Sequence, residues 1–153
     1  MIVANRSNIQ SRTFPARRTS TNVVGGLSPV QAGGFSMGHV VLEGNGGQVP
    51  WHNHEQEEVY YILSGQGEMC VDAEATRVSA GDVVLIQSNA FHQLTNIAET
   101  ELEFIYCYAP VGNVLHWQQE LDGTLPQAGF GAPPLPKEAC PQFTDRNEAR
   151  PED

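Results

Sequence analysis

The sequence predicts an all-β fold, and three observations carry this prediction. Between about residues 35 and 110 the chain falls into short apolar runs, mostly five to eight residues long, that are rich in valine, isoleucine, tyrosine and phenylalanine. Turn signals separate these runs, chiefly from among the 15 glycines of the chain. No helical period of useful length appears in this region. Closely spaced strands with glycine-rich turns are typical of a sandwich or a barrel.

The chain has 153 residues, which is about the length of one domain. Its composition is 40% hydrophobic and 17% charged, which provides enough apolar material for a packed core. The longest apolar run is far shorter than the ~20 residues that span a bilayer. We therefore expect a soluble, single-domain protein with no membrane partner.

Residues 1–34 are expected to form an N-terminal arm. The net charge of the chain is −10, yet its first 42 residues contain four arginines and no acidic residue. This arm could pack on the acidic body of its own chain or on a dimer partner. An organelle transit peptide is the alternative, which Pro15 and the paired glycines disfavour because they interrupt an amphipathic helix. The overall negative charge argues against nucleic acid as a partner.

Residues 35–110 are expected to form the barrel. The runs, in chain order, are FSMGHVVLE, VYYILSG, GEMCVD, TRVSAGDVVLI, HQLTN and ELEFIYCYA. Several have apolar residues on both faces, as in Phe104 and Tyr106 against Ile105 and Cys107, which is typical of strands between two buried surfaces or at a subunit interface. A short open barrel also leaves sheet edges that natural proteins cover, so we predict a homodimer.

Residues 111–153 are expected to hold one short helix and a proline-rich strap and tail. The run NVLHWQQELDGTLP places Val114, Trp117 and Leu121 on one helical face, and Gly123 would end the helix. Residues 125–153 hold six of the ten prolines.

The cysteines indicate a reducing environment. Cys70, Cys107 and Cys140 have no paired spacing and an odd count, so neither a disulfide framework nor a cysteine-type zinc site is expected. Without an apolar signal-peptide region, a cytoplasmic location is the default.

The segment that carries chemistry is GGQVPWHNHEQEEVYYILSG. His52 and His54 are two residues apart, so in a strand both imidazoles point to the same face. Glu58 follows four residues later, and His92 begins another apolar run across the barrel. Imidazoles with a carboxylate suit one divalent ion, most readily zinc, with iron, nickel and manganese as alternatives.

Two spaced patterns identify a family. Gly46, His52, His54, Glu58 and Gly65 fit the first cupin motif, and Gly81, His92 and Asn96 fit the second. Gln87 and Asn89 stand where that second motif has proline and glycine, which affects loop shape rather than the ligands. The chain thus resembles the cupin superfamily, which implies a single-domain double-stranded β-helix, or jelly-roll barrel.

Two more histidines, His39 and His116, lie outside these two motifs. If Met37, His39 and Val41 form the inward face of their strand, His39 could be a fourth nitrogen ligand, and Glu58 could then move behind the ligands. A hydrogen-bonded core histidine is the alternative. His116, after the barrel, is expected to be an ordinary surface or strap residue.

The strings QVPWHNHEQEEVYY, FHQLTN and HWQQELDGTLP are similar to those of the resistomycin-type polyketide cyclases. That resemblance implies a metal-dependent aldol-type cyclisation of a poly-β-keto intermediate in secondary metabolism, inside an apolar cavity that Trp117 and Phe130 could close. Glu58, His92 and His39 are the catalytic candidates. A dioxygenase acting on a β-diketone or flavonol-like molecule and a non-catalytic ligand-binding cupin are the alternatives.

Overall fold

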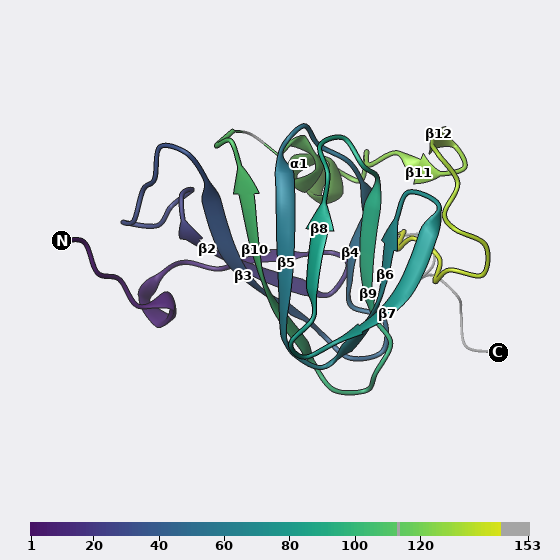
Figure 1. Ribbon diagram of the computed structural model, residues 1–153, viewed down its shortest axis with the longest axis horizontal. Coiled ribbons are helices and arrows are strands. Elements are labelled where there is room, and N and C mark those ends of the chain that lie inside the picture. Colours follow the sequence, from purple (N-terminus) through teal and green to yellow (C-terminus); the bar gives the residue numbers. More distant parts are fainter. Residues whose placement is uncertain (113, 145–153) are drawn as a thin grey trace.

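The computed structural model describes residues 1–112 and 114–144, and these residues form the all-β fold that the sequence predicts (Figure 1). The elements, in chain order, are η1 (Arg6–Asn8), β1 (Arg12–Phe14), β2 (Arg18–Val24), β3 (Ser36–Leu42), β4 (Gln48–His52), β5 (Glu57–Ser64), β6 (Gln66–Val71), β7 (Glu74–Ser79), β8 (Val83–Ile86), β9 (His92–Asn96), β10 (Leu102–Ala109), α1 (Leu115–Asp122), β11 (Gln127–Ala128) and β12 (Gly131–Ala132).

Two sheets form the barrel. The six-stranded sheet has the strand order β1-β2-β3-β10-β5-β8, and the four-stranded sheet has the order β4-β9-β6-β7. Successive strands often lie in different sheets, as in a jelly roll. The pair β11–β12 belongs to the C-terminal segment beside the barrel (Figure 1).

The core lies between the two sheets. In β10 the side chains alternate between buried and half-buried, so Phe104, Tyr106 and Tyr108 face the interior. The first sheet also contributes Leu42 and Ile62 to the core cluster. From the second sheet come Val49, Met69, Val78 and Leu94.

The expected arm is part of the barrel sheet. Strand β2 pairs with β3 from Arg18 opposite Leu42, and β1 pairs with β2. The segment therefore covers the edge of the sheet in its own chain. Along β2, Arg18 and Ser20 are buried, whereas Thr19 between them is half-buried. Strand β4, which contains His52, was not among the predicted strands either.

The predicted helix is present, and Val114 and Trp117 of its expected apolar face pack against the core, but the fully buried side chains of the helix itself are polar. It ends at Gly123, whose φ of 68° is left-handed and favours glycine. Its buried side chains are His116 and Glu120, whereas Leu121 is exposed. His116 and Glu120 are buried because they have polar partners inside the barrel, which are described below.

In the described part of the chain, Cys70, Cys107 and Cys140 are free thiols. Within the described residues, the helices are too short and too polar to cross a lipid bilayer.

Candidate metal centre

Three histidines meet at one end of the barrel interior. His52 ends β4, His54 follows it, and His92 begins β9 directly opposite His52 in the strand register. One donor atom from each lies within 4.8 Å of the other two. The spacing in the sequence thus brings the three expected imidazoles together.

The free ring nitrogens of all three histidines are Nε2 atoms. Nδ1 of His52 lies 2.6 Å from the Pro50 carbonyl oxygen, that of His54 lies 3.0 Å from the Gln56 oxygen, and that of His92 lies 2.9 Å from the Ala90 oxygen. A carbonyl oxygen only accepts, so each Nδ1 carries the proton. The three Nε2 atoms therefore present lone pairs, as metal-binding imidazoles must.

Glu58 completes the donor set. Its Oε2 lies 2.9 Å from Nε2 of His54 and 3.2 Å from Nε2 of His92. A carboxylate only accepts, so this close approach is stabilised either by a proton on the imidazole Nε2, as a hydrogen bond, or by a cation bound to both groups. Nε2 of His52 is buried without any hydrogen-bond partner in the described residues. The four groups therefore fit a divalent metal ion of the zinc, iron, nickel or manganese class.

The surroundings keep these groups in their metal-binding forms. Burial, reinforced by the nearby imidazoles of His116, His92 and His54, holds the pKa of His52 well below its usual value. Burial alone would raise the pKa of Glu58, but hydrogen bonds with His54 and His92 outweigh it and leave that pKa lowered. A neutral imidazole and an ionised carboxylate persist together in this site.

The loop before His92 keeps its shape despite the departure from the family pattern. Asn89 adopts a left-handed φ of 65°, the conformation for which glycine is used. Its backbone N–H donates to the His54 carbonyl oxygen at 2.8 Å, which ties the second motif to the first.

His116 corrects the sequence interpretation. It was expected at the surface, but it is 6% exposed and its ring stacks on His52 with centroids 3.6 Å apart. Its Nδ1 is buried without a hydrogen-bond partner in the described residues, and burial lowers its pKa well below the usual value. The sequence offers one weak signal, the spacing of His116 and Glu120 by one helical turn, which places both on one face of α1.

His39 is not part of the cluster, and the expected inward face of its strand is wrong. The neighbours Val40 and Leu42 are in the core, so His39 points to the opposite face of the sheet. There its Nε2 pairs with a carboxylate oxygen of Glu103 at 2.9 Å.

The barrel interior is nearly full. Next to the cluster lies a cavity of about 20 Å³, which is room for one water molecule. In the described residues, the expected apolar cavity over the metal centre is reduced to this small space, because α1 and the inward tyrosines line it closely. The cavity wall includes Arg18, Glu58, Tyr60, Tyr106, His116 and Trp117.

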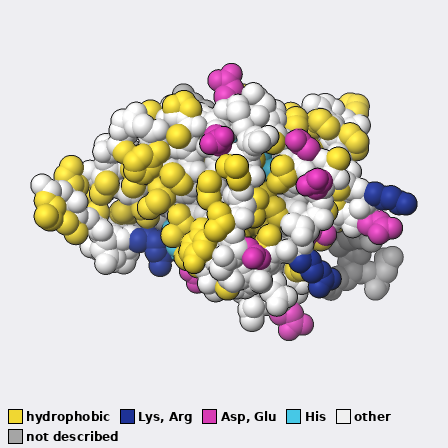
Figure 2. Space-filling view, in the orientation of Figure 1, with side chains coloured by type: hydrophobic (Ala, Val, Ile, Leu, Met, Phe, Trp, Pro, Cys, Tyr) yellow, Lys and Arg dark blue, Asp and Glu magenta, His cyan; other side chains and the backbone are white. Residues whose placement is uncertain are grey.

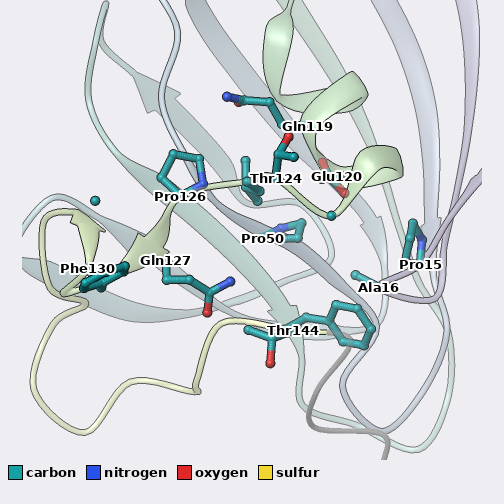
Figure 3. Close-up of a pocket in the computed structure, with 14 residues that line it drawn as sticks. Pro15, Ala16, Pro50, Gln119, Glu120, Thr124, Pro126, Gln127, Phe130 and Thr144 are labelled. Atoms are coloured by element: carbon teal, nitrogen blue, oxygen red, sulfur yellow. The ribbon is translucent and has the colours of Figure 1, made fainter.

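A larger pocket of about 600 Å³ lies on the outer side of α1 (Figure 3). Figure 3 shows Gln119, Thr124 and Pro126 facing Ala16 and Thr144 across the hollow. Of the two aromatic residues expected to close the barrel, Trp117 contributes to the cavity wall, whereas Phe130 is exposed and lines this outer pocket.

Comparisons with known proteins agree with this fold. Residues 38–108 match the family model described as "Cupin domain". An oxalate-binding protein of Thermotoga maritima is 39% identical over 61 residues, which are 39% of this chain and 50% of that protein. The match thus spans about half the length of that relative.

Solved structures share the fold. The polyketide cyclase RemF from Streptomyces resistomycificus superposes with a TM-score of 0.60 at 20% identity, covering 74% of this chain and 85% of that one. A structure from Thermotoga maritima described as a predicted oxalate decarboxylase gives a TM-score of 0.61 at 21% identity, covering 72% of this chain and 100% of that one. At these identities the likeness concerns the fold.

Proposed function

Because residues 38–108 form a domain of the cupin superfamily, we propose that this chain is a metal-dependent polyketide cyclase. The reaction would be an aldol-type cyclisation and aromatisation of a poly-β-keto intermediate. His52, His54 and His92 would hold one divalent ion, with Glu58 as the fourth donor or as the base. Zinc is the ion we propose, because neutral imidazoles with a carboxylate suit it and the reaction needs no redox change.

The observation that carries the proposal is the position of Glu58. Its carboxylate touches two of the imidazoles and also lines the interior cavity. A methylene between two carbonyl groups is already acidic, so a carboxylate base held in a fixed place can remove its proton. When bound, the ion would supply a Lewis acid that polarises a carbonyl oxygen.

The other residues of the cavity would orient the substrate and exclude water. Tyr60 and Tyr106 are buried, and burial keeps the pKa of both phenols raised, so these side chains remain neutral hydrogen-bonding groups. The cavity holds about one water molecule, so the mouth under α1 must open before a polyketide enters. The likeness to RemF supports the choice of a cyclase.

The test combines metal analysis with turnover under argon. We expect close to one equivalent of zinc, cyclisation of a poly-β-ketone without oxygen, and loss of turnover in Glu58→Gln with the zinc retained. Consumption of oxygen, or activity only in air, would replace the cyclase with the dioxygenase and zinc with iron, nickel or manganese.

A second candidate is a non-catalytic protein that binds small carboxylates. The relative named as an oxalate-binding protein favours it, as does the small size of the cavity. This candidate predicts saturable binding of oxalate, with no product formed from a poly-β-ketone. Under either candidate, we propose a cytoplasmic homodimer whose ligand is a small molecule.

A further inference from the structure

A buried ion pair connects α1 to the wall of the barrel. Nη1 of Arg18 lies 2.8 Å from Oε2 of Glu120, and Nη2 of Arg18 lies 2.8 Å from Oε1. Arg18 is 2% exposed and Glu120 is 7% exposed. The guanidinium thus holds a carboxylate through two parallel contacts, the geometry with which arginine binds carboxylates in general.

Arg18 is positioned independently of Glu120. Its Nη1 also donates to the Gln48 carbonyl oxygen at 3.2 Å, and its guanidinium carbon lies 4.0 Å from the centroid of the Phe14 ring. These contacts come from β4 and β1, so they would keep the guanidinium in place if α1 moved. An arginine so held, with its carboxylate removed, is a preformed anion site.

This anion site adjoins the metal centre. Arg18, Glu58 and His116 line the same small cavity. A molecule whose carboxylate lay on Arg18 would therefore extend toward the imidazole cluster. While Glu120 occupies the guanidinium, only about one water molecule fits beside it.

Glu120 also lies at the boundary of the outer pocket. It lines the pocket of about 600 Å³ together with Gln119 and Pro50 (Figure 3). A hollow of that size accommodates a typical small-molecule ligand. Displacing the Glu120 side chain would join the outer pocket to the inner cavity.

Three contacts hold α1 to the barrel: the Arg18–Glu120 pair, the stack of His116 on His52, and Trp117 packed against the core. The helix has one side-chain pair of buried residues, His116 and Glu120, and no side-chain cap at its start. Leu115 and Leu121 are exposed. The attraction within a buried ion pair is largely offset by the cost of removing both charges from water. If Glu120 leaves, the carboxylate of an incoming ligand would take its place as the negative partner of Arg18.

We propose that the Arg18 guanidinium is the binding site for the carboxylate of a small-molecule ligand, and that Glu120 occupies this site in the closed state as a built-in competitor. Ligand entry from the outer pocket displaces Glu120 together with α1. The inference rests on the proposed function only in that the far end of the ligand would then face the metal cluster.

The experiment is calorimetric titration with malonate, using neutral malonamide as the matched ligand. Glu120→Gln keeps the size of the side chain but removes the competing charge, so malonate should bind about tenfold more tightly or better than to the unaltered protein. The double variant Arg18→Met/Glu120→Leu replaces the pair with apolar residues that can keep the packing, and it should show no such binding. Malonamide should bind to none of the proteins.

Each titration is repeated on metal-loaded and metal-stripped protein. Arg18 is outside the donor set, so the gain in Glu120→Gln should persist after stripping. If malonate binds only to loaded protein, and equally in all variants, the anion site is wrong while the metal centre stands. If the protein binds no metal but shows the Arg18-dependent binding, the proposed function fails and the anion site stands.

Trp117 reports the movement of α1. In a Trp51→Phe background, malonate should shift the fluorescence of Trp117 to longer wavelength, because this half-buried side chain leaves the barrel with the helix. Binding without any change in this emission would show that α1 stays in place and would overturn the displacement.

Discussion

The imidazoles of His52 and His116 stack in the barrel interior with their ring centroids 3.6 Å apart and their planes inclined by 24°. One residue ends strand β4 and the other lies on α1, beyond the barrel. The stack ties the helix to the metal centre and gives that centre a fourth imidazole.

Replacing His116 should weaken metal binding. In His116→Ala we expect the metal affinity to fall about 10–100-fold, the range found when a group that supports metal ligands is removed. Competition with a chromogenic chelator measures it. His116→Phe separates the two contributions of the ring, because it keeps the stack and removes the nitrogens. Unchanged affinity in both variants would show that His116 has no part in the centre.

Removing the metal should destabilise the protein. An ion present at about 1,000 times its dissociation constant adds about 4 kcal/mol to the free energy of unfolding. We therefore expect a chelator to lower the melting temperature of the unaltered protein and to leave that of His52→Gln unchanged, as followed by circular dichroism. An equal decrease in both proteins would mean that His52 does not bind the ion.

His39→Gln should leave metal content unchanged. The side chain faces away from the cluster and pairs with Glu103, which is 36% exposed. Such a pair contributes about 0–1 kcal/mol, so the free energy of unfolding should change little. Loss of metal from His39→Gln, determined by elemental analysis, would contradict the outward orientation of this side chain.

The metal-free protein should lose stability as the pH falls below about 6.5. The folded state lowers the pKa of His52 and of His116, so in this range the unfolded chain binds protons that the folded chain does not. Stability then decreases on acidification, by at most about 1.4 kcal/mol per pH unit for each histidine. Urea titrations at several pH values measure the slope, and His52→Gln/His116→Gln should flatten it. A slope unaffected by both substitutions would assign the effect to other groups.

The outer face of β5 and β8 should bind a second copy of this chain. Val83 and Leu85 are 64% and 55% exposed on β8, the edge strand of its sheet, and Tyr61 and Leu63 are exposed beside them on β5. Figure 2 shows apolar side chains gathered on the face where Figure 1 draws β10, β5 and β8. Two copies of this apolar face can pack against each other across a twofold axis, so the face suits a homodimer.

Sedimentation velocity tests this prediction. The unaltered chain should sediment as a dimer at micromolar concentration, and Val83→Lys/Leu85→Lys should sediment as a monomer. Ala75→Lys, on the outer face of the other sheet, is the matched control and should remain dimeric. A monomeric unaltered chain would overturn the prediction.

The sequence predicted those parts of the fold and site that local patterns determine. The apolar runs with glycine turns correspond to strands β3 and β5 through β10, and the spacing of His52, His54, Glu58 and His92 brings their side chains together. These features depend on strand alternation and on turn length, both of which are visible in a single sequence.

The parts that failed depend on distant partners. In β3 both alternating faces are apolar, so the sequence could not tell whether Val40 or His39 faces the core. His116 is buried together with Glu120, and the charge of Glu120 is paired with Arg18, which lies far away in the chain. The small cavity likewise reflects how α1 seats in the barrel mouth, which no local pattern indicates.

The separation of Arg18 and Glu120 by 102 positions sets an order of events during synthesis. Every strand that carries a donor of the metal centre leaves the ribosome before α1 does. Until the helix emerges, the guanidinium has no counter-ion from this chain, and the three imidazoles can be reached from the barrel mouth. We therefore expect that a barrel folded before α1 packs could take up its ion through this mouth, with Glu120 covering the mouth afterwards.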